Sequence, residues 1–144
     1  AQRGLDDQAF VRHEEALRRP QLFFHSAPLD AARTVCGRIV FDARISIDTP
    51  DTDVRVDLHA IEADGDIVWL GGDAIRARFR ADPTRETFDP PGRILPWRFD
   101  RFWWTCRRLD GGTRLRLTVG PVDHPYFQKN LNTGGRIGHE RMAD

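Results

Sequence analysis

Apolar residues at every second position, in one segment after another, constrain this chain more than any other feature. In residues 39–47 every odd-numbered position is Ile, Phe or Ala, and most of the even-numbered positions are polar. Successive side chains of a β-strand point to opposite faces, so this pattern predicts a strand with one buried face. The same alternation returns at 54–60, 75–80, 95–99 and 115–119. Half-buried strands therefore dominate the chain.

Two more β-prone segments complete the strand pattern. Residues 21–25 contain Leu-Phe-Phe between prolines, and residues 67–70 follow an Asp64-Gly65 pair that predicts a hairpin with the strand before it. At least seven strands with almost no helix indicate an all-β sandwich or barrel. We favour a two-sheet jelly-roll sandwich, and the strand order is not readable from the alternation.

A run of consecutive aromatic residues interrupts the alternation. Phe102-Trp103-Trp104 predicts a bulge, or else a strand buried on both faces. One strand face does not need this much aromatic area. The alternative to a purely core role is an interface with another domain or a ligand. The candidate interface residues are the aromatic ones of this region, namely Trp97, Phe99, Phe102, Trp103 and Trp104.

A length of 144 residues predicts one domain over residues 1–144, with its core at about 20–135. The acidic residues and apolar positions of 6–17 fit a short N-terminal helix or turn. Residues 136–144 are expected to form a frayed tail.

The net charge of the chain does not indicate a binding partner. Acidic and basic residues balance at 22 each, which argues against a nucleic-acid or anionic-membrane partner. No apolar run approaches the roughly 20 residues that span a bilayer. Several arginines fall on the predicted outer faces of strands, where acidic residues can lie opposite them; they are Arg76, Arg78, Arg80, Arg114 and Arg116.

Catalytic and metal-binding patterns are missing. The chain has no Gly-X-Ser-X-Gly turn, and its two serines, Ser26 and Ser46, have structural interpretations. The histidines are scattered, which argues against zinc, and Asp is a favoured turn residue, which argues against calcium at 51–53 or 64–66. Cys36 and Cys106 are interpreted as two buried free thiols. We therefore expect no cofactor and no catalytic residue.

Separated motifs resemble one known family. Residues 48–54, with Asp51 and Asp53, are followed by 63–65 and, near the end, by 112–117 and 124–135. Together these segments resemble the C-terminal, galactose-binding-like jelly-roll domain of the X-Pro dipeptidyl-peptidase and cocaine esterase family of serine hydrolases. Its terminal Asn-Thr-Gly element corresponds to Asn132, Thr133 and Gly134.

The resemblance implies a non-catalytic domain that packs beside an α/β-hydrolase domain holding the Ser, Asp and His triad. Enzymes of this family act on X-Pro peptides or on small esters and amides. Residues 99–108 depart from the family pattern. A stand-alone carbohydrate-binding or adhesion module is the alternative. Homo-oligomerisation stays open, and a cytoplasmic location is slightly favoured.

Overall fold

The computed structural model describes residues 21–122 and 127–141. The helix or turn expected within 6–17 lies outside these residues. The described part forms eight strands and one 3-10 helix. They are β1 (Leu22–His25), β2 (Arg33–Arg38), β3 (Phe41–Ile45), β4 (Asp53–Ile61), β5 (Ile67–Arg76), η1 (Ala77–Phe79), β6 (Leu95–Phe99), β7 (Trp104–Leu109) and β8 (Arg114–Gly120). No helix among them is long and apolar enough to cross a membrane.

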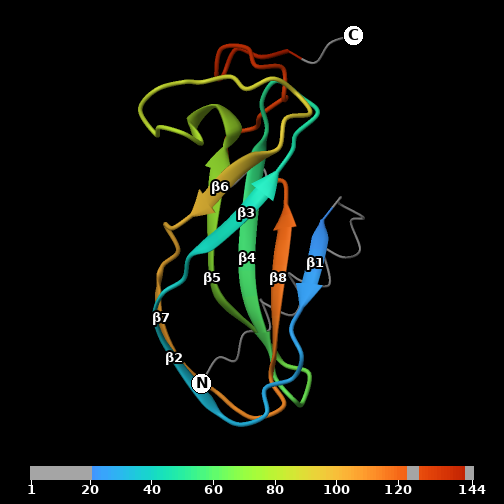
Figure 1. Cartoon of the computed structure of the whole chain (residues 1–144), viewed down its shortest axis with the longest axis vertical. Coiled ribbons are helices and arrows are strands. Elements are labelled where there is room, and N and C mark those ends of the chain that lie inside the picture. The colour runs from blue at the N-terminus through green and yellow to red at the C-terminus, as the bar shows by residue number, and fades with distance from the viewer. Residues whose placement is uncertain (1–20, 123–126, 142–144) are drawn as a thin grey trace.

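One layer is an antiparallel sheet with strand order β1-β8-β4-β5, whose strands stand side by side in Figure 1 with β5 on the left and β1 on the right. The predicted hairpin joins β4 to β5. At its tip Gly65 has a φ of 91°, which an L side chain rarely adopts, and the Asp66 amide donates to the Asp64 carboxylate over 3.1 Å. Glycine and aspartate therefore supply the turn geometry that the pattern predicted.

The second layer is a pair of two-stranded ribbons, β2–β7 and β3–β6, and the β3–β6 ribbon crosses in front of the sheet in Figure 1. Arg38 pairs with Trp104 in one ribbon and Phe41 with Phe99 in the other. Two residues (39 and 40) thus lie opposite four (100–103). This irregularity is the bulge that the consecutive aromatic residues predicted.

The core fills the space between the two layers. Under β3 and β6, Phe99 is fully buried and packs with Val56, Trp97 and Phe102. A smaller cluster of Ala60, Leu70 and Leu109 lies under β2 and β7. A Cβ added at Gly71 would lie 3.3 Å from Phe102, so the glycine leaves room for that ring. Two antiparallel layers packed in this way confirm the all-β sandwich.

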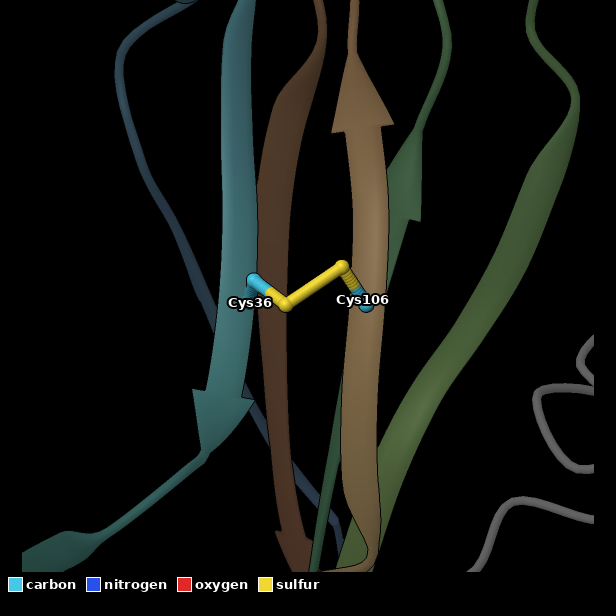
Figure 2. The surroundings of a disulfide bond; sticks show 2 residues. All are labelled: Cys36 and Cys106. Carbon is cyan, nitrogen blue, oxygen red and sulfur yellow. A yellow bond between two sulfur atoms is a disulfide. The ribbon is translucent and has the colours of Figure 1, made fainter.

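The cysteine interpretation is wrong. Cys36 of β2 lies directly opposite Cys106 of β7, and the two form a disulfide whose residues are both exposed (Figure 2). Alternation along both strands puts this pair on the outer face, because Val35 and Leu109 point into the core. Strand β2 was not predicted, so the pairing that joins the two cysteines could not be foreseen.

Candidate functional site

A cluster of charged side chains gathers where β4 begins and β5 ends. In Figure 1 this end of the sheet also holds η1 and the C-terminal segment, drawn in red. We call it the arginine–carboxylate cluster; it consists of Asp51, Asp53, Arg76, Arg78, Asn130 and Glu140. It joins three segments that are far apart in the sequence.

Asp51 and Arg78 form the buried centre of the cluster. The side chain of Asp51 is 0% exposed and that of Arg78 is 1% exposed. Arg78 donates to the Asp51 carboxylate from its backbone amide over 3.0 Å and from Nε over 2.8 Å. Its guanidinium also donates to the carbonyl of Gly135 over 2.9 Å and lies 5.0 Å from the Phe88 ring centroid. Burial makes this pairing necessary, because an unpaired charge in the interior is costly.

The prediction that Arg78 lies on an outer face is therefore wrong. The strand expected over 75–80 ends at Arg76, and the chain turns into η1, which breaks the two-residue alternation and directs Arg78 inward. Arg116 is also buried rather than exposed, with its guanidinium 5.6 Å from the Phe23 ring centroid. Arg114 is exposed as expected, and Arg80 pairs with Asp89 over 2.9 Å.

Asp53 and Asn130 extend the cluster. Arg76 donates to both oxygens of Asp53, from Nε over 2.7 Å and from Nη2 over 2.9 Å. This two-point geometry suits a planar guanidinium. The amide nitrogen of Asn130 donates to Asp51 Oδ2 and to Asp53 Oδ1, each over 3.0 Å. Asn130 thus links the two aspartates of the 48–54 motif to the C-terminal segment.

The Asn-Thr-Gly element lies beside this link. The backbone amide of Asn132 donates to Asn130 Oδ1 over 2.8 Å, and Thr133 donates its hydroxyl to Glu140 over 2.8 Å. Asn132 and Gly134 both have positive φ values, 63° and 74°, so the backbone here is tightly turned. The structure therefore brings five of the motif residues to one end of the domain, namely Asp51, Asp53, Asn132, Thr133 and Gly134.

Residues 136–144 were expected to form a frayed tail, but Glu140 within them is bound to the rest of the domain. Its carboxylate accepts hydrogen bonds from the Leu131 amide and the Thr133 hydroxyl and lies 3.6 Å from Arg78 Nη2. Burial alone would raise the pKa of Glu140, but these hydrogen bonds and the positive charges of Arg78 and Arg76 outweigh it and lower the pKa. Sequence reasoning missed Glu140 because nothing in the pattern of residues 136–144 indicates a buried position.

A pH dependence follows from Glu140. Because its pKa is lower in the folded state, the unfolded chain binds the proton more readily in acid, and folding gains stability as the carboxylate ionises. The free energy of unfolding should therefore fall as the pH drops below the ordinary Glu value of about 4.3 toward the folded-state pKa. Urea unfolding of the wild type and Glu140→Gln between neutral and acidic pH measures this difference. Parallel pH profiles for the two proteins would contradict it.

The five candidate interface residues differ in exposure: three are buried and two are exposed. Trp97, Phe99 and Phe102 are buried in the core, so they offer no surface to a partner. Trp103 and Trp104 are 75% and 72% exposed. An interface at this place stays a prediction, and these two residues alone are exposed enough to form it.

Both serines lie just after the end of a strand. Ser26 accepts a hydrogen bond from the Leu115 amide and donates to its neighbour's carbonyl, which ties the end of β1 to β8. Ser46 is exposed just after β3. No group of three His, Cys, Asp or Glu side chains among residues 21–122 and 127–141 is arranged to hold a metal ion.

Comparisons with known proteins agree with this geometry. A family model described as the X-Pro dipeptidyl-peptidase C-terminal non-catalytic domain matches residues 2–142. Cocaine esterase from Rhodococcus sp. (strain MB1 Bresler) is 26% identical over 117 residues, which cover 81% of this chain and 20% of the esterase.

Solved structures show the same fold. An aminopeptidase from the marine sediment archaeon Thaumarchaeota archaeon matches with a TM-score of 0.77 and 22% identity, over 85% of this chain and 21% of its own. An α-amino acid ester hydrolase matches with a TM-score of 0.71 and 19% identity, over 88% and 21%. This chain thus spans about a fifth of the length of these relatives.

Proposed function

Since the chain belongs to the family of X-Pro dipeptidyl-peptidase C-terminal non-catalytic domains, we propose that it is the accessory domain of a serine hydrolase of the dipeptidyl-peptidase or esterase type. Membership confirms the resemblance read from the motifs. The relatives named as hydrolases are about five times longer than the matched part, which supports a separate catalytic domain in the parent protein. The proposed role is to stabilise that domain by packing against it.

One observation carries the proposal: a family model described as a non-catalytic domain matches residues 2–142, nearly the whole chain. The arginine–carboxylate cluster supports a scaffold role. Its charged side chains bind one another and hold loops and the C-terminal segment together. An active site would instead direct such groups toward a substrate. The motif residues are therefore explained by structure alone.

The chain alone is expected to be inactive. An assay with an X-Pro-nitroanilide and with small aryl esters should show no turnover by this chain, and turnover by the longer parent protein at the same concentration. The physical reason is that the Ser26 hydroxyl is held by backbone partners, the Leu115 amide and the Ala27 carbonyl, whereas a hydrolase serine needs a histidine base. Turnover by the chain that persists in a Ser26→Ala/Ser46→Ala variant would contradict the proposal. A parent protein inactive on both substrate classes would contradict the proposed enzyme type.

A further inference from the structure

An exposed apolar patch lies at the bend of the second layer. Trp103 and Trp104 are largely exposed, and Val40 is 43% exposed. Val40 lies in the two-residue segment opposite residues 100–103, which include Trp103, and Trp104 is the first paired residue of β7. We call Trp103, Trp104 and Val40 the tryptophan patch. Two indole rings at this exposure present on the order of 300 Å² of mainly apolar surface, the size of patch that often has a function.

The patch is held on a rigid support. Trp104 lies two residues from Cys106 on the outer face of β7, and its cross-strand partner Arg38 lies two residues from Cys36. The disulfide therefore links the two strands two residues away from Trp104 (Figure 2). Phe102, next to Trp103, is 2% exposed and anchors the bulge in the core. The backbone under the patch therefore has little freedom left to lose when a partner binds, which favours binding.

Two arginines border the patch, and the carboxylate next to them, Asp100, is paired with Arg98 over 3.3 Å. Arg38 and Arg101 are exposed, and among the described residues neither guanidinium has an ion-pair partner. The arginines farther along β7 are different, because Arg107 pairs with Glu62 over 3.0 Å and Arg108 pairs with Asp110 over 3.2 Å. Tryptophan and arginine are the residue types most enriched at the energetic centres of interfaces. The complementary surface would be apolar at its centre and acidic at its edge.

We propose that the tryptophan patch is the surface on which the catalytic domain of the parent hydrolase docks, with acidic groups of that domain facing Arg38 and Arg101. This inference rests on the proposed function. We name the catalytic domain as the binding partner because about four fifths of each matched relative lies outside the part that this chain covers. The accessory domain then meets its partner through the outer face of the ribbon and leaves the arginine–carboxylate cluster free of that contact.

Hydrogen–deuterium exchange on the intact proteins tests the footprint. Amides of residues 100–104 should exchange at least tenfold more slowly in the longer parent protein than in this chain alone. The hairpin tip at 62–66 serves as an internal reference and should exchange equally in both. Equal exchange of 100–104 in the two proteins would overturn the docking inference and leave the proposed function intact. A reading frame without any hydrolase domain would instead overturn the proposed function.

Variants of the parent protein identify the residues responsible. Trp103→Ala/Trp104→Ala should abolish the slowed exchange at 100–102. Trp69→Ala is the matched control, because Trp69 is 41% exposed and alternation puts it on the outer face of the other layer. Loss of the footprint in the Trp69 variant alone would overturn the inference. Sedimentation of this chain alone adds a second readout: a dimer that disappears in the double variant would make a second copy the occupant and also overturn it.

Discussion

Asp51→Ala should lower the free energy of unfolding by about 3–5 kcal/mol, because it removes the fully buried carboxylate that pairs with the buried Arg78 guanidinium. The loss comes mainly from an interior charge that has lost its nearest counter-charge. Arg78 keeps a carbonyl partner at Gly135, and Glu86 and Glu140 lie 3.4 and 3.6 Å away, so the compensation is partial and the lower end of the range is expected. Equilibrium urea unfolding of the 144-residue chain measures the change directly.

Asp42→Ala is the matched control for that result. Asp42 pairs with Arg98 over 3.0 Å, but both side chains are about 60% exposed, so this ion pair should contribute less than about 1 kcal/mol. The Asp51→Ala/Arg78→Met double variant should recover part of the stability lost in Asp51→Ala, because the stranded charge is then absent. Equal losses for Asp51→Ala and Asp42→Ala would show that burial does not govern the Asp51 pair.

The same pair shows where sequence reasoning stops. Alternation through Ile75 and Ala77 predicted an outward Arg78, and it failed because a single 3-10 turn changes which way the next side chain points. Local periodicity carries no information on such a turn. Asp51 and Asp53 were singled out through the family resemblance, yet their partners are contributed by η1, β5 and the C-terminal segment. Contacts between distant segments depend on the packed fold and are invisible in the pattern.

Much of the sandwich was nonetheless predictable. Strands β3, β4, β6 and β8 coincide with clean alternation, because one face of each meets the core. On the opposite face of β4 and β8, His59 and Arg116 were predicted to point outward but are also buried. The bulge was predictable from Phe102-Trp103-Trp104, since consecutive apolar residues cannot all share one strand face. Strand β2 was missed because its arginines and Gly37 give it weak β propensity, and only pairing with β7 makes it a strand. Its cysteine was therefore misread as well.

Reduction of the Cys36–Cys106 disulfide should lower the free energy of unfolding by about 2–4 kcal/mol. The bond closes a loop with a sequence separation of 70, and a cross-link of that span removes chain entropy from the unfolded state worth about 4 kcal/mol. The loop encloses β3 to β6, so the constraint acts on most of the fold. The β2–β7 pair also has no third strand among the described residues, and an isolated two-stranded ribbon is only marginally stable.

Guanidinium unfolding with and without dithiothreitol measures this effect, and Cys36→Ala/Cys106→Ala provides the control. The double variant should unfold at the same denaturant concentration in both conditions and should match the reduced wild type. Because both cysteines lie on the exposed face of the ribbon, the reductant should reach the bond without prior global unfolding. A wild type whose midpoint is unchanged by the reductant would mean that strand pairing and the Leu109 core contacts hold the ribbon without the cross-link.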